Sequence, residues 1–139
     1  MNKPNIYYLI IGRLRRLTSK ERKSFPNYKY VTISKFEYHD DDKVIKIPKG
    51  FLTDGSTGGP DYGCAWLFHD YLYSTHKFAN GNECTREEAD RIMKRILVND
   101  RMSIYCWLFV FASHMNFLGL FTKAWNSSGN RGPEFLILD

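Results

Sequence analysis

The sequence predicts an α+β fold, in which a short antiparallel β-sheet from the N-terminal third packs against about three C-terminal helices. Residues 28–38 alternate along the chain and are rich in aromatic and β-branched side chains, which is typical of a strand. Residues 61–75 and 85–98 place apolar side chains at helical spacing. With 139 residues, 43% of them hydrophobic, the chain can build one sizeable core and is too apolar to be disordered.

The other elements of the N-terminal third are shorter. Residues 6–11 are expected to form a strand or a buried N-terminal segment. The basic segment that follows is expected to form a short helix or a loop. Residues 44–47 are the return strand of a hairpin that turns at 39–42. The three adjacent aspartates of that turn lack the spacing of an EF-hand, which favours a solvated hairpin tip. Residues 51–53 are a short third strand.

The helices have recognisable start signals. Pro60 follows two glycines, which places it near the first helical position. Thr85 and Glu88 have the spacing of a capping box, so they mark the start of the second helix. Residues 102–121 are the most apolar run and predict a buried third helix. Their length matches the ~20 residues of a membrane span, so a membrane or interfacial helix stays open as an alternative.

The length indicates one domain made of four consecutive parts. These are a basic N-terminal segment (1–27), the β-sheet (28–53), a loop plus helical core (54–125) and a tail (126–139).

The charge is positive and local. The chain carries a net charge of +5 with a pI of about 9.1, which permits an anionic partner without requiring one. A charge run is usually a solvated face and less often a binding patch, so nucleic acid and a membrane or lipid surface stay open as partners. The run comprises Arg13, Arg15, Arg16, Lys20, Arg22 and Lys23.

The cysteines and the N-terminus indicate a reducing compartment. Cys64, Cys84 and Cys106 are odd in number and scattered, which argues against a disulfide framework and against a CxxC-type zinc site. The six apolar residues at 6–11 are too short for the hydrophobic region of a signal peptide.

The candidate catalytic and binding residues are concentrated in residues 50–97. His69 lies in an otherwise apolar helix and shares a face with Tyr73, four residues on. A neutral histidine can act as a general base on water if a second group fixes its tautomer, and Asp90 on the next helix is the candidate. Arg86, four residues before Asp90, is an alternative partner for it. A purely structural hydrogen bond between His69 and Asp90, completed by Arg86, is the other interpretation.

The loop before this helix is rich in glycine. Asp54 and Gly55 begin it, and its small residues let the backbone approach a ligand closely. Such a loop can present carbonyl groups to a hard cation such as calcium, or N–H groups to an anion. A plain connection between a strand and a helix is the alternative.

The central region resembles a family of uncharacterised proteins of tailed phages and prophages, over roughly residues 28–125. The resemblance implies a phage origin and no settled activity. The family usually has Ala-Ser-Val-Pro where this chain has residues 56–60. The motifs that carry it are Pro48/Gly50-Phe51, Thr53-Asp54-Gly55-Ser56, His69-Asp70-Tyr71-Leu72-Tyr73, Arg86-x-x-Ala89-Asp90, Gly119 and Trp125.

A second resemblance is to secreted and parvoviral phospholipases A2, which share a glycine-rich calcium loop and a His-Asp-x-x-Tyr helix. The loop here lacks their Tyr-Gly-x-Gly-x-x-Gly pattern. The resemblance implies that His69 activates water, Asp90 orients His69 and Tyr73 hydrogen-bonds Asp90. A calcium ion that polarises the ester carbonyl would be held by Asp70 and the loop. The remaining predicted site residues are Asp54 and Gly55 as metal ligands, and Arg86, Ser56 and Thr53 as further binding residues.

Three classes of function follow. The first is a calcium-dependent esterase or phospholipase-like hydrolase. The second is a non-enzymatic virion structural or accessory protein in which the His-Asp-Tyr network is structural and virion proteins are the partners. The third is a phage protein that binds a host factor. The expected location is the host cytoplasm or the virion.

Overall fold

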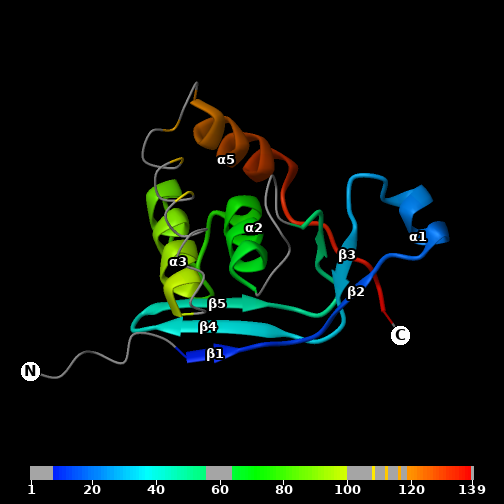
Figure 1. Cartoon of the computed structure of the whole chain (residues 1–139), viewed down its shortest axis with the longest axis horizontal. Helices are drawn as coiled ribbons and strands as arrows, with labels where there is room; N and C mark the ends of the chain where they lie inside the picture. The colour runs from blue at the N-terminus through cyan, green and yellow to red at the C-terminus, as the bar shows by residue number, and fades with distance from the viewer. Residues whose placement is uncertain are drawn as a thin grey trace, which may run out of the picture. The chain divides into compact units, whose positions relative to one another are not determined.

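The structure is a computed structural model that describes residues 8–55, 64–99, 108, 112, 116 and 119–138 (Figure 1). Antiparallel strands occupy the N-terminal part and helices the C-terminal part, so the predicted α+β class is confirmed. The prediction of a single domain stays a prediction. By internal contacts the chain divides into two compact units, a first one of Met1–Pro60, Phe78–Asn82 and Glu134–Asp139 and a second one of Asp61–Lys77 and Glu83–Pro133.

The first unit contains two three-stranded antiparallel sheets where the sequence suggested one. In the first sheet, β4 (Phe36–Asp40) lies between β1 (Tyr8–Ile10) and β5 (Lys43–Ile47). The β4–β5 hairpin is the predicted one, and Asp41 makes its turn with a left-handed φ of 54°.

The second sheet consists of β2 (Leu14–Arg16), β3 (Tyr30–Thr32) and β6 (Leu52–Thr53), with β3 in the middle. The single strand predicted over 28–38 is wrong, because a bend after β3 sends the chain into the other sheet as β4. At this bend the Arg13 N–H donates to Ser34 Oγ over 2.8 Å. Gly12 approaches so closely that a Cβ there would lie 2.3 Å from the Lys35 carbonyl oxygen.

The connection between β2 and β3 carries the short helix α1 (Ser19–Ser24). Thr18 and Glu21 form a capping box at its start, and none of its residues is buried. The C-terminal segment returns to β6, where the Leu52 N–H donates to the Glu134 carbonyl over 3.0 Å. Residues 134–138 therefore extend this sheet region.

The second unit contains α2 (Ala65–Thr75), α3 (Arg86–Asn99) and α5 (Leu120–Arg131). The capping box that starts α3 is confirmed, because Glu88 N–H donates to Thr85 Oγ1 and Thr85 N–H donates to Glu88 Oε1, both over 3.1 Å. Pro60, the predicted start of the preceding helix, lies outside the described residues. The buried stripe of α3 consists of Ala89, Asp90, Ile92, Ile96 and Leu97.

The region after α3 differs from the sequence expectation. The apolar run 102–121 lies almost entirely outside the described residues. The predicted tail from Asn126 is wrong at its start, because α5 continues to Arg131. Asn116 Oδ1 accepts the Phe121 N–H over 2.8 Å at the beginning of α5, a contact that the Ser/Gly/Asn-rich composition does not indicate. Within the described part of the chain, no helix is both long and apolar enough to span a bilayer.

Candidate functional site

The central contact of the second unit joins α2 to α3. His69 Nε2 donates to Asp90 Oδ1 over 2.7 Å. The two side chains are 16% and 7% exposed, so the pair is largely removed from water while the imidazole keeps some access to it. Twenty-one residues separate them, and the α2–α3 packing brings them together. The sequence prediction that Asp90 is the partner of His69 is confirmed.

Tyr73 binds the same oxygen of the Asp90 carboxylate as His69 does. Its hydroxyl donates to Asp90 Oδ1 over 2.7 Å, and its ring centroid lies 4.1 Å from that of His69. Burial, followed by the negative charge of Asp90, raises the pKa of Tyr73 well above its ordinary value. The phenol therefore remains a hydrogen-bond donor throughout the physiological pH range.

Arg86 binds the other oxygen of the Asp90 carboxylate. Its Nη1 donates to Asp90 Oδ2 over 3.0 Å, one helical turn away, while Nη2 contacts Glu87 Oε1 over 3.3 Å. Asp90 thus accepts from three side chains, one of them cationic, which compensates the cost of burying its charge. Both predicted partners of Asp90 bind it together, so the two alternatives read from the sequence are not exclusive.

The network continues to α5 through aromatic contacts. Trp125 meets Tyr73 edge-on at 5.0 Å between centroids and stacks on His76 at 3.7 Å with an interplanar angle of 4°. His76 Nε2 also donates to the Trp125 carbonyl over 2.9 Å. The sequence analysis missed His76. His76 follows the last residue of α2 as a left-handed cap with a φ of 57°, so helical spacing from Tyr73 gave no signal for it.

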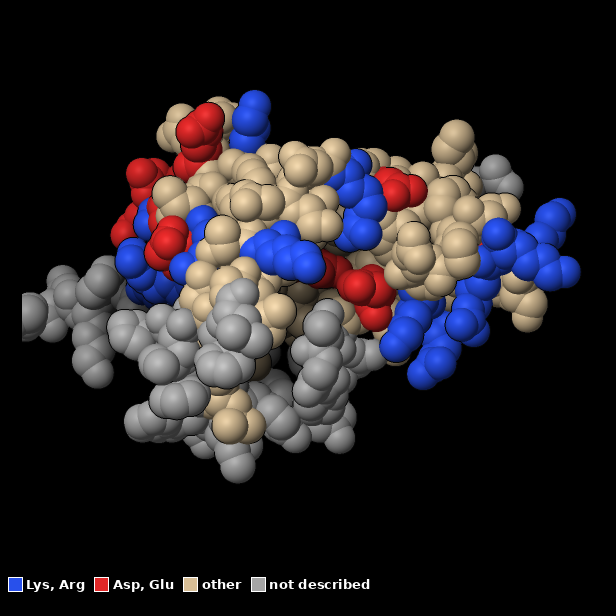
Figure 2. Space-filling view, turned by 90° about the horizontal axis from the view of Figure 1, so that it is seen from above, with Lys and Arg blue, Asp and Glu red and all other residues tan. Residues whose placement is uncertain are grey.

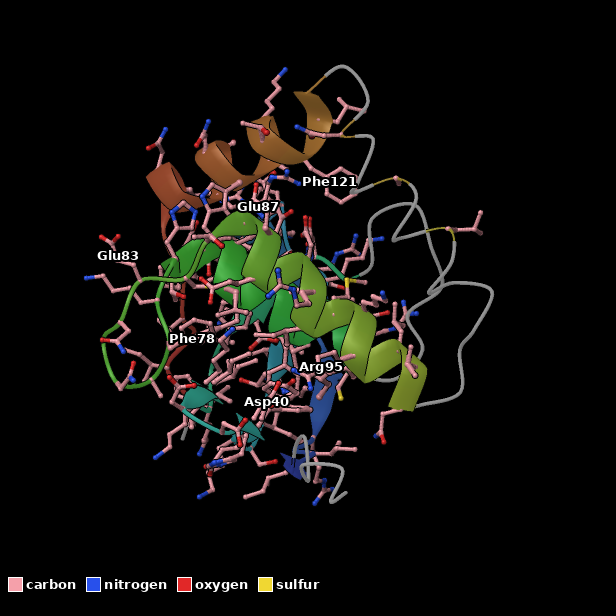
Figure 3. All side chains as sticks on the ribbon, turned by 90° about the vertical axis from the view of Figure 1, so that its left-hand side faces the viewer. Asp40, Phe78, Glu83, Glu87, Arg95 and Phe121 are labelled. Carbon is pink, nitrogen blue, oxygen red and sulfur yellow. The ribbon has the colours of Figure 1, made fainter. Side chains whose placement is uncertain are left out.

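A pocket of about 450 Å³ opens beside this network, and His76, Arg86 and Trp125 belong to both. Figure 3 shows two acidic residues of its rim, Glu83 on the segment before α3 and Glu87 in the first turn of α3. Its cationic and acidic side chains are balanced, and an aromatic wall adjoins them. The lining consists of His76, Lys77, Glu83, Cys84, Thr85, Arg86, Glu87, Thr122 and Trp125.

The predicted metal ligands are distributed over both units. Thr53 is buried and accepts the Gly55 N–H over 3.4 Å, whereas Asp54 is exposed, and all three belong to the first unit. Asp70 is half-buried on α2 in the second unit. Ser56 and the loop up to Gly63 lie outside the described residues. Within the described ranges, no three or more His, Cys, Asp or Glu side chains are grouped to hold a metal ion, and the calcium site stays a prediction.

The fold and this cluster define a small α+β protein with a largely buried His-Asp-Tyr-Arg network. Residues 30–113 match the family described as "Protein of unknown function (DUF1353)". The match covers more than half of the chain, and the chain belongs to this family. No curated protein and no solved structure gives a significant match. His69, Tyr73, Arg86 and Asp90 all fall within the matched segment.

Proposed function

We propose that this protein is a hydrolase in which His69 is the general base and Asp90 is the residue that orients it. The observation that carries the proposal is the 2.7 Å contact between His69 Nε2 and Asp90 Oδ1. The carboxylate is itself held by Tyr73 and Arg86, so it cannot rotate freely away from the imidazole. A base fixed in one tautomer and one orientation is the arrangement that general-base catalysis needs.

The chemistry follows from which nitrogen faces Asp90. With the proton of His69 held on Nε2, Nδ1 is the atom that takes a proton from water. The water oxygen then bonds to the carbonyl carbon of an ester, and the bond from that carbon to the leaving oxygen breaks. The leaving oxygen takes the proton back from Nδ1, so an acid and an alcohol are released and the imidazole is neutral again.

Calcium belongs to the proposal as the group that would stabilise the charge on the ester carbonyl oxygen. The Asp70 carboxylate, next to His69 on α2, would offer an oxygen ligand of the kind that calcium prefers. The support is chemical, because a carboxylate directly follows His69 on α2 and a glycine-rich loop precedes that helix. The substrate class is a lipid ester or another simple ester, and a phage or viral origin is proposed on the motif resemblance.

The test is an ester-hydrolysis assay with and without calcium on the wild type, His69→Gln and Asp90→Asn. General-base catalysis contributes about 10²–10⁴-fold, so we expect a loss of that size in His69→Gln with the circular dichroism spectrum intact. The matched control is Asp42→Asn, which removes an exposed carboxylate in the β4–β5 turn, outside the network and its pocket, and should leave the rate unchanged. Hydrolysis that is equally fast in His69→Gln would refute the assignment.

A second candidate is a non-enzymatic virion or accessory protein in which the network holds two helices together. The specific observation that favours it is the Arg86–Asp90 ion pair, whose side chains are 16% and 7% exposed. The pair lies within α3 and holds the carboxylate of Asp90 in place. Asp90 can therefore accept from His69 and Tyr73 of α2 and join the two helices whether or not a substrate binds. This function predicts no ester hydrolysis by the wild type, a large loss of stability in His69→Ala, and incorporation of the protein into particles.

A further inference from the structure

The strongest concentration of charge in the chain lies far from the His69 network along the sequence. Residues 13–29, here called the basic hairpin, run from just before β2 through α1 to just before β3. They contain seven lysines and arginines and one acidic residue, a net charge of +6. The whole chain has a net charge of +5, so the basic hairpin carries all of the excess positive charge.

The fold presents this charge on the surface. Six of the seven cationic side chains are exposed, and α1 contributes no buried residue. Figure 2 shows a group of Lys and Arg side chains at the right-hand end, on the side where Figure 1 draws α1. The exposed six are Arg13, Arg16, Lys20, Arg22, Lys23 and Lys29.

The single acidic residue of the basic hairpin serves the hairpin's own structure. Glu21 accepts Arg15 Nη1 over 2.7 Å and Nη2 over 3.0 Å, and it also caps α1 through the Thr18 N–H. It therefore neutralises Arg15, the one half-buried cation. Among the residues that the structure describes, none of the six exposed cations forms an ion pair with a carboxylate.

Apolar residues hold the basic hairpin in place from its two ends. Leu17 and Tyr28 are buried in a cluster with Val31 and Leu52, and Phe25 packs against that cluster. The exposed cations therefore belong to a segment that is fixed to the core by apolar packing. Close like charges repel one another in the free protein, and a polyanion would relieve that repulsion.

We propose that the basic hairpin binds the phosphate backbone of a nucleic acid duplex without reading its sequence. Double-stranded DNA carries one negative charge per ~1.7 Å of axis, so the ~9 Å length of α1 faces about five of them. Arginine guanidinium groups and lysine ammonium groups are the side chains that bind phosphate.

Two observations favour a duplex over other polyanions. None of the exposed large apolar side chains of the described residues lies between residues 13 and 29, so the basic hairpin has nothing to insert into a bilayer. Single strands are bound largely by stacking bases on open aromatic rings. Here Tyr28 is buried, Phe25 packs against the core, and the Tyr30 ring is covered by the Arg16 guanidinium at 5.6 Å.

The experiment measures binding of the full chain to a fluorescent DNA duplex of about 20 base pairs between about 50 and 200 mM salt. The test variant is Lys20→Gln/Arg22→Gln/Lys23→Gln, which removes three exposed cations of α1. We expect micromolar binding that weakens steeply with salt, with the slope reduced by about three in the variant because each lost phosphate contact contributes about one. The melting temperature should not change, because α1 buries no residue.

The matched control is Lys46→Gln/Arg91→Gln/Lys123→Gln, which lowers the net charge equally at exposed positions on β5, α3 and α5. We expect its binding to stay near that of the wild type. Equal losses in both triple variants would overturn the proposal, because only net charge would then matter. Absence of duplex binding at about 50 mM salt would also overturn it. So would binding confined to phosphatidylcholine vesicles with about 30% phosphatidylserine, which would identify a lipid surface.

Discussion

Replacing Asp90 by alanine tests the centre of the second unit directly. The substitution removes the acceptor of His69, Tyr73 and Arg86 at once, at a site where the carboxylate is 7% exposed. The Arg86 guanidinium, 16% exposed, then loses its closest acidic partner and keeps only the 3.3 Å contact with Glu87. The damage therefore comes mainly from donors left without an acceptor, one of which is charged.

The magnitude follows from these contacts. Breaking a buried ion pair by removing one partner costs about 3–5 kcal/mol of unfolding free energy. Tyr73→Phe removes one hydrogen bond to the same carboxylate and should cost about 1.5–3 kcal/mol, the range for bonds to a charged group. Glu87→Ala removes a solvent-exposed partner of Arg86 and should cost less than about 1 kcal/mol.

The assay is urea unfolding followed by tryptophan fluorescence at neutral pH, with the m value compared between variants. Because the pair is largely buried, the loss in Asp90→Ala should change little when salt is raised. An Asp90→Ala protein that loses less stability than Tyr73→Phe would refute the network, because the carboxylate would then not be the shared acceptor.

Two further predictions concern other parts of the chain. The Arg15 hydrogen bonds lower the pKa of Glu21 to about 2, so its stabilising contribution is present above pH 4.5, its ordinary pKa, and is lost as the pH falls toward 2. Thermal melts at several pH values should show Glu21→Gln less stable than the wild type at neutral pH and equal to it near pH 2, and a constant difference would contradict this. In Gly129→Ala, the new Cβ would lie 2.3 Å from Cε1 of His76, whose ring is stacked on Trp125, so we expect a loss of about 1–3 kcal/mol in urea unfolding. An unchanged midpoint would mean that α5 moves without cost.

The predictions that succeeded rest on local signals. The capping box of Thr85 and Glu88 and the apolar stripe of α3 are set by spacing within one helix. The pairing of His69 with Asp90 was also predictable, because two ionisable groups in apolar surroundings must find partners.

The predictions that failed depend on contacts between distant segments. Residues 28–38 alternate without interruption, yet the chain bends after β3 because Gly12 and Arg13 approach residues 34 and 35 from far along the sequence. The helix through Asn126–Asn130 has weak intrinsic propensity, and its packing against α2 through Trp125 overrides that. Neither contact leaves a signal in the local pattern.

Arg86 determines which test separates the two functions proposed for the network. In a general-base site the carboxylate stabilises the imidazolium that forms on His69, and its full negative charge is then most effective. Here Asp90 Oδ2 is bound by a guanidinium at 3.0 Å and Oδ1 is shared between His69 and Tyr73, so part of that charge is already offset. A hydrolase built on this network must obtain more of its rate from stabilising the charge on the substrate carbonyl oxygen than from the basicity of His69. Calcium dependence is therefore a sharper criterion than the loss of activity in His69→Gln. An esterase rate that is unaffected both by calcium and by His69→Gln would leave the network without its proposed chemistry and would favour its role as a connection between α2 and α3.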